Sequence, residues 1–279
     1  MSSAVQEPWT VRLSRAPCRL HQFGAGTPRI LALHGFSGSG ADFEGLAQVK
    51  DLSLCCPDLP GHGLSPVLPM ASSQWLGGME LCVEHLAELV AAEFVARPLL
   101  LGYSMGGRLA LSAALRYPDL FSSLVLIGAS PGLQDDSERN ERRVLDEQRA
   151  SSMEQDGLDA FMAAWEQLPL LRSQRRMEPE LWARFSARRR TADVSGLAWS
   201  LRAMGTGSMP PLWEQLPQLQ LPVLLIAGAE DQRYLKLAEQ MSRRLPSARC
   251  EFIQGCGHSP HLERPESVAS LLEQLLACL

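Results

Sequence analysis

The sequence predicts an α/β fold: a mostly parallel sheet with helices on both faces and an inserted helical cap. Short apolar runs such as 30–33 and 223–228 alternate with segments of helix length, a pattern typical of parallel strands joined by crossover helices. Between about 131 and 212 these runs stop, and the apolar residues of segments such as 158–165 are spaced as in helices. We therefore expect a core formed by 1–130 and 213–279, and a cap subdomain formed by 131–212.

Composition and charge exclude several classes of protein. The chain has 279 residues, a net charge of −5 and seven cysteines. Its length suffices for a large core, and its acidic balance argues against a nucleic-acid surface. No apolar run approaches the ~18 residues of a membrane span, and the first eight residues contain no apolar stretch of a secretory signal. With no C-x-x-C pair, the cysteines are expected to be reduced thiols of a cytoplasmic protein, and no metal site is implied. The oligomeric state is left open.

The segment Gly102-Tyr103-Ser104-Met105-Gly106 carries the strongest chemical signal. It follows the apolar run 98–101 and precedes the helical pattern of 107–117. A G-x-S-x-G sequence between a strand and a helix is typical of a nucleophile elbow, in which a sharp turn exposes the serine hydroxyl. The two glycines permit the strained turn and the close approach of strand and helix. Ser104 is therefore the predicted reactive serine, and whether it acts as a base or as a covalent nucleophile is left open.

An acid and a histidine follow Ser104 in the order that such a site requires. Asp231 lies just past the predicted strand 223–228, and His258 lies in a glycine-flanked loop after the predicted strand 250–253. The histidine would act as a base toward Ser104, and the aspartate would fix its tautomer. Glu230 is a competing candidate for the acid; its position favours Asp231. Together the three residues predict a catalytic triad.

The loop after strand 30–33 predicts an oxyanion hole. In this arrangement one backbone N–H comes from that loop and the other from the residue after the nucleophile, which here would be Phe36 and Met105. His62, in the turn 58–65, is interpreted as structural. These motifs cover about residues 29 to 265, and the chain resembles the α/β-hydrolase fold superfamily.

The predicted cap is rich in arginine. The chain has only two lysines among its 26 basic residues, and twelve of the arginines lie between 131 and 210 together with thirteen acidic residues. Most of these arginines are expected to be solvated, salt-bridged residues of helix surfaces. A few could face the site, where the planar guanidinium binds carboxylates. Arg175 and Arg176 are expected to lie outside the cavity.

A narrower resemblance rests on less common segments. Tyr103 precedes the serine and Arg108 follows it by four residues; Ser130-Pro131-Gly132-Leu133 and the stretch 196–207, ending Met204-Gly205-Thr206-Gly207, lie further on. These segments resemble the 2-succinyl-6-hydroxy-2,4-cyclohexadiene-1-carboxylate synthases of menaquinone biosynthesis.

That resemblance implies a lyase that removes a proton and expels pyruvate from a small polyanionic substrate, without a cofactor. It further implies that Arg108, Arg142 and Arg189 bind substrate carboxylates. Tyr103 and Trp165 would belong to the substrate site. Because Arg188, Arg189 and Arg190 are consecutive, the register of this assignment is open by one residue.

Other functions remain compatible with the same motifs. Serine hydrolases of esters, or of carbon–carbon bonds in anionic diketones, share the triad and the oxyanion loop, so only the cap and Arg108 distinguish them from the synthase. A binding protein with a vestigial triad is a third class, against which the intact Ser104, Asp231 and His258 argue.

Overall fold

A single sheet of eight strands organises the computed structural model, which describes residues 6–278. The strand order is β1-β2-β4-β3-β5-β6-β7-β8. The first two junctions, β1 with β2 and β2 with β4, are antiparallel, and every later one is parallel. The predicted fold class is thereby confirmed. The strands are β1 (Trp9–Arg12), β2 (Pro17–Phe23), β3 (Ile30–Leu33), β4 (Leu54–Pro57), β5 (Leu99–Tyr103), β6 (Ser123–Ile127), β7 (Val223–Gly228) and β8 (Ala248–Ile253).

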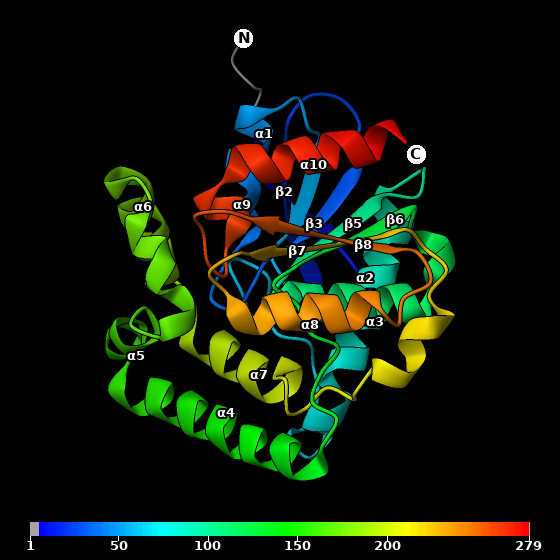
Figure 1. The fold of residues 1–279 in the computed structure, drawn as a ribbon. Helices are drawn as coiled ribbons and strands as arrows, with labels where there is room; N and C mark the ends of the chain where they lie inside the picture. The colour runs from blue at the N-terminus through cyan, green and yellow to red at the C-terminus, as the bar shows by residue number, and fades with distance from the viewer. Residues whose placement is uncertain (1–5, 279) are drawn as a thin grey trace.

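Helices cover both faces of the sheet (Figure 1). One face carries α1 (Glu44–Val49) and α10 (Pro265–Ala277), with α9 (Pro260–Glu263) beside them; the other carries α2 (Gly78–Glu93), α3 (Met105–Arg116) and α8 (Gln232–Ser242). Strand residues alternate between the two cores: Leu100 packs toward α2 and α3, whereas Leu99 and Leu101 pack toward α1 and α10. Because both faces are covered, the central strands are apolar throughout.

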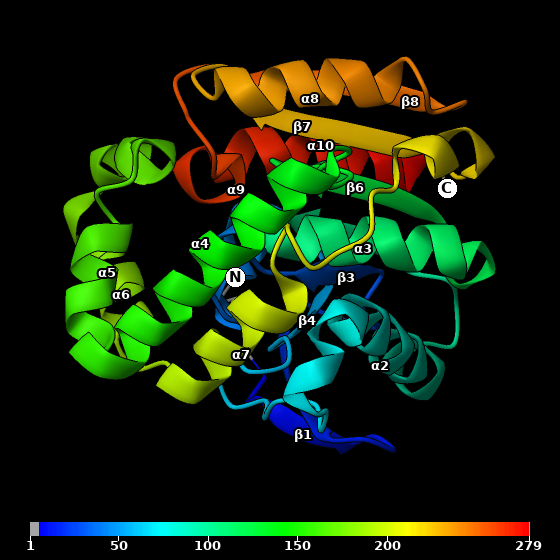
Figure 2. The ribbon, with the colours of Figure 1, turned by 90° about the horizontal axis from the view of Figure 1, so that it is seen from below.

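The chain between β6 and β7 forms a helical layer beside the carboxyl ends of the strands (Figure 2). Its helices are α4 (Asp136–Asp156), α5 (Leu158–Trp165), α6 (Pro179–Arg189) and α7 (Val194–Met204), with the 3₁₀ helix η4 (Pro169–Arg176) between α5 and α6. Shorter 3₁₀ helices elsewhere are η1 (Gly40–Phe43), η2 (Ser72–Gly77), η3 (Pro118–Leu120) and η5 (Trp213–Gln218). A small core of its own holds α4, α5 and α7 together, including Met153, Met162 and Leu197. None of the helices within 6–278 combines the length and apolarity needed to cross a membrane.

The turn between β5 and α3 is strained at the predicted reactive serine. Ser104 has φ +51° and ψ −107°, a left-handed conformation that is costly for a residue with a Cβ. The turn also brings α3 against β3, since a Cβ added to Gly106 would lie 2.2 Å from the Leu33 carbonyl oxygen. Glycine at 106 is therefore required by close backbone packing.

This packing predicts the effect of a single methyl group. Gly106→Ala is expected to lower the free energy of unfolding by about 1–3 kcal/mol, since the Leu33 backbone must move. Urea unfolding measures the change. Gly45→Ala is the matched control: it also adds a helical Cβ, but nothing lies within 4 Å of it. We expect Gly45→Ala to be neutral or stabilising, and equal losses in the two variants would contradict this account of the elbow.

Candidate active site

Ser104, His258 and Asp231 lie in hydrogen-bonding contact. His258 Nε2 is 3.0 Å from Ser104 Oγ, and His258 Nδ1 is 2.7 Å from Asp231 Oδ2. His258 and Asp231 are buried, whereas Ser104 is half-buried and lines a cavity. The competing acid, Glu230, instead forms an ion pair with Arg176 at 2.5 Å. The structure therefore brings together the three residues predicted from the strand ends.

Backbone hydrogen bonds fix the two partners of Ser104. Asp231 is also the N-cap of α8, where its Oδ1 accepts a hydrogen bond from the Tyr234 amide at 3.3 Å. The buried Glu263 accepts from the amides on either side of His258, those of Gly257 at 3.0 Å and Ser259 at 3.2 Å. The imidazole therefore stands on a loop held from both sides. Glu263 was not anticipated from the sequence.

Two backbone amides are free beside Ser104. Phe36 follows β3 and Met105 is the first residue of α3, and both line the same cavity as Ser104. Among residues 6–278, neither amide donates a hydrogen bond to another protein group. Unpartnered amides at these two positions have the donors that an oxyanion hole requires. Their catalytic role stays a prediction.

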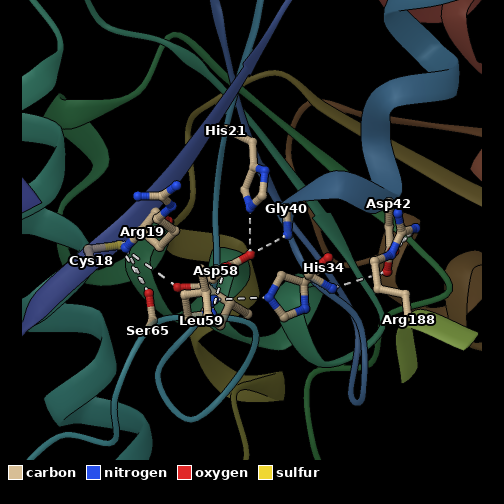
Figure 3. A network of polar contacts seen from close by, with 12 residues as sticks. Cys18, Arg19, His21, His34, Gly40, Asp42, Asp58, Leu59, Ser65 and Arg188 are labelled. Atoms are coloured by element: carbon tan, nitrogen blue, oxygen red, sulfur yellow. Dashed lines mark hydrogen bonds and ion pairs between the residues drawn. The ribbon is translucent and has the colours of Figure 1, made fainter. Parts of the chain in front are cut away.

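A buried polar network supports the loop that carries Phe36 (Figure 3). His34 Nε2 accepts a hydrogen bond from the Leu59 amide at 2.9 Å, so its Nδ1 carries the proton and donates to the Gly35 carbonyl at 2.8 Å. Burial lowers the pKa of His34, which keeps the ring neutral. Asp58 Oδ1 accepts from the Gly40 amide at 2.8 Å and lies 3.0 Å from His21 Nε2. These contacts tie β2, β3 and the following loop into one support.

His62 belongs to the packing beneath this loop. Its ring lies 5.1 Å from the His34 ring and 5.9 Å from the Phe36 ring. Burial lowers its pKa to about 3. The ring is therefore neutral at physiological pH and does not line the cavity, a placement consistent with the structural interpretation.

The cavity above Ser104 has a volume of about 800 Å³, within the range of small-molecule sites. Its floor is the core, with Phe36, Ser104 and Met105, and its other walls come from α4, η4, α7 and α8. Trp165 lines it on the cap side, with its ring 5.0 Å from Phe36 and 5.6 Å from Phe161. Positively charged residues outnumber negatively charged residues in the cavity wall, where the acidic residues are Glu230 and Asp231. The arginines are Arg108, Arg142, Arg149, Arg172, Arg175, Arg176 and Arg233.

Arg108 and Arg142 are the predicted carboxylate ligands that reach this cavity. Arg108 Nη1 donates to the Met204 carbonyl at 2.8 Å, and no carboxylate within residues 6–278 lies within ion-pair distance of it. Burial, followed by the like charge of Arg142, lowers the pKa of Arg108 to about 10, so it remains charged at neutral pH. Arg142 is held by Asp146, with its Nε 2.9 Å from both carboxylate oxygens.

Arg189 does not line the cavity, which corrects the expectation that it faces the site. It ends α6 with 4% exposure, its guanidinium 4.0 Å from the centre of the Phe185 ring and its Nη1 3.2 Å from Gln174 Oε1. The two neighbours are also engaged elsewhere: Arg188 donates to Asp42 at 2.7 Å and Arg190 to Glu166 at 2.8 Å. None of the three consecutive arginines therefore reaches the cavity in this structure, because each is held by a partner in or beneath the cap.

Tyr103 and the arginines of η4 are also placed differently from the expectation. Tyr103 is buried behind Ser104, where its hydroxyl lies 2.6 Å from Ser259 Oγ, and it supports the site without lining it. Arg175 and Arg176, expected outside the cavity, line it as exposed residues because η4 crosses beside Glu230. Within 6–278, no group of three or more His, Cys, Asp and Glu side chains is arranged to hold a metal ion.

Comparisons with known proteins identify the fold family of this chain. The family model described as the alpha/beta hydrolase fold matches residues 28–265. A Bacillus subtilis protein, named provisionally as a 2-succinyl-6-hydroxy-2,4-cyclohexadiene-1-carboxylate synthase, is 36% identical over 90% of each chain. A Salmonella newport protein with that synthase name is 31% identical, covering 90% of this chain and 94% of its own.

Solved structures of other proteins have a similar fold. MenH from S. aureus superimposes with a TM-score of 0.83 at 27% identity, covering 95% of this chain and 98% of its own. A Thermogutta terrifontis esterase shares the fold, with a TM-score of 0.80 at 24% identity. The matched residues span both the triad and the segment between β6 and β7. This chain therefore belongs to the α/β hydrolase fold family.

Proposed function

We propose that this protein is the menaquinone-biosynthesis lyase that forms 2-succinyl-6-hydroxy-2,4-cyclohexadiene-1-carboxylate and pyruvate. Its substrate would be 2-succinyl-5-enolpyruvyl-6-hydroxy-3-cyclohexene-1-carboxylate. The observation that carries the proposal is a triad serine opening onto a cavity with Arg108 and Arg142 in its wall. The substrate has three carboxylates, and charges enclosed under a cap must be paired. The synthase names of two relatives support the same assignment.

The reaction that these residues can perform is an elimination. His258 accepts the Ser104 hydroxyl proton, and the serine oxygen removes the ring C2 proton, which is acidic beside the succinyl ketone. The electron pair forms the C2–C3 double bond, the C3–C4 double bond shifts to C4–C5, and the C5–O bond breaks. The leaving enolpyruvate becomes pyruvate on taking up a proton. The amides of Phe36 and Met105 would stabilise negative charge on the ketone oxygen during proton removal.

A serine hydrolase remains the competing function, because the triad contacts and free amides also suit acyl transfer. A steady-state comparison separates the two. We expect turnover of the tricarboxylate, with pyruvate release followed by a coupled assay, to exceed turnover of a short-chain aryl ester by at least ~100-fold in kcat/KM. Brisk ester turnover without pyruvate release would overturn the proposal in favour of a hydrolase.

A further inference from the structure

Arg149 lines the cavity beside Arg142, and neither the sequence motifs nor the proposed reaction gives it a part. The two residues lie two turns apart on α4, so their side chains share a helix face. The Arg149 guanidinium lies 5.5 Å from the centre of the Trp165 ring, and 25% of its side chain is exposed. An aromatic face orients a guanidinium without using its N–H donors. Arg149 is therefore held against Trp165, a residue that also lines the cavity, with N–H donors to spare.

The buried carboxylate of Asp146 lies between these two arginines. Its side chain is 3% exposed; both oxygens are 2.9 Å from Arg142 Nε, and Oδ1 is 3.4 Å from Arg149 Nη1. Asp146 packs closely against Gly205, since a Cβ added to Gly205 would lie 2.7 Å from Asp146 Oδ2. The contact occupies only Nε of Arg142. Within residues 6–278, its two terminal nitrogens have no hydrogen-bond acceptor.

The charges in this part of the wall do not balance. Asp146 supplies one negative charge, and Arg108, Arg142 and Arg149 supply three positive charges. Burial lowers the pKa of both Arg108 and Arg149, and the positive charge of Arg142 is the second cause in each case. Such a cluster is completed by an anionic ligand. The α-carbons of Arg142 and Arg149 are about 10 Å apart along the helix axis, a spacing that suits carboxylates on separate arms of one molecule.

We propose that Arg149 is a further carboxylate ligand of the substrate, and that Asp146 is the positioning residue that aims Arg142 and Arg149 into the cavity as a pair. The proposal rests on the proposed function for the identity of the substrate. Its chemistry is more general: the pair selects ligands with two or more carboxylates over singly charged ones of the same shape.

Removing the positive charge of Arg149 tests whether this residue binds a substrate carboxylate. Arg149→Met keeps an unbranched side chain beside Trp165, and we expect it to raise KM for the tricarboxylate about tenfold or more, with kcat changed less than threefold. Arg149→Lys should recover part of the loss. Arg202→Met is the matched control, because Arg202 pairs with Glu147 and Glu154 of α4 and does not line the cavity. A KM for Arg149→Met within twofold of the wild-type value would overturn the proposal.

A double-variant cycle tests the positioning role. Asp146→Asn is expected to raise KM. The double variant Asp146→Asn with Arg149→Met should raise KM by clearly less than the product of the two single-variant factors. Glu147→Gln, the adjacent residue on the outer face, is the control. If the KM factors of the two substitutions simply multiply, or if Asp146→Asn lowers kcat alone, Asp146 does not position the arginines. If Asp146→Asn does not fold, the KM values of Arg149→Lys and Arg149→Met are compared. A lower KM for Arg149→Lys shows that the positive charge at position 149 is what matters, and equal KM values contradict it.

A binding measurement separates this inference from the proposed reaction. Citrate is a tricarboxylate that cannot undergo the elimination, and calorimetry can compare its affinity for the wild type and Arg149→Met. We expect at least a fivefold weaker Kd for the variant, whether or not the wild type releases pyruvate from the synthase substrate. Equal citrate affinities would contradict the carboxylate role even if the proposed function held. Absent pyruvate release with weakened citrate binding would reject only the proposed function.

Discussion

Ser104→Ala is expected to lower kcat for pyruvate release by about 1,000-fold or more, with a much smaller change in KM. In the proposed reaction Ser104 Oγ, which lies 3.0 Å from His258 Nε2, is the atom that removes the substrate proton. His258→Ala should cost a similar factor, and the double variant little more, because residues that act as one unit are not additive.

Stopped-flow or coupled detection of pyruvate measures this loss. Ser112→Ala is the matched control: it lies on α3, the helix that follows Ser104, and among residues 6–278 its hydroxyl bonds only the Arg108 carbonyl oxygen. Melting temperatures of Ser104→Ala and wild type should agree closely, which separates a lost step from a lost fold. Turnover of Ser104→Ala near the wild-type rate would mean that the base is another group.

Arg108→Met is expected to lower kcat/KM for the tricarboxylate by about 30- to 1,000-fold, equivalent to roughly 2–4 kcal/mol of binding to the transition state. Arg108 lies one helical turn after Ser104 and faces the cavity as a charge without a carboxylate partner among residues 6–278. In the proposed complex, removing Arg108 would leave one substrate carboxylate buried and unpaired. The same reasoning predicts a comparable loss for Arg142→Met.

The control for Arg108→Met is Arg116→Met, an exposed residue two turns further along α3. It should stay within about twofold of wild type, as exposed charges usually do. Any residual cleavage of a neutral aryl ester should be nearly unchanged in Arg108→Met. Loss of ester and tricarboxylate activity by the same factor would show that Arg108 shapes the site and does not bind an anionic group.

The convergence of Ser104, Asp231 and His258 could be predicted from the sequence because each residue is marked by a local signal. Ser104 is marked by its strand, turn and helix. Asp231 lies three residues after the end of β7, and His258 lies five residues after the end of β8. Carboxyl ends of parallel strands meet at one edge of the sheet, so three residues at strand ends converge without further information. For the same reason the placement of Phe36 after β3 followed from sequence.

The cap could not be predicted to the same depth. Arg188, Arg189 and Arg190 lie at the end of α6 and point in directions about 100° apart. Whether any of them faces the cavity depends on how α6 packs against Asp42, Phe185 and the rest of the cap. No periodic signal in the sequence encodes that packing. Arg175 and Arg176 reach the cavity only because η4 passes beside Glu230, a tertiary contact.

The most direct test of the central claim, elimination at a hydrolase-type site, is a reaction of the tricarboxylate in H₂¹⁸O followed by mass spectrometry. The account predicts pyruvate and 2-succinyl-6-hydroxy-2,4-cyclohexadiene-1-carboxylate in a 1:1 ratio, with no solvent oxygen in the ring product, because water is not a reactant. Hydrolysis of the bond to the succinyl group would instead release succinate carrying one ¹⁸O. That result, without pyruvate, would contradict the account.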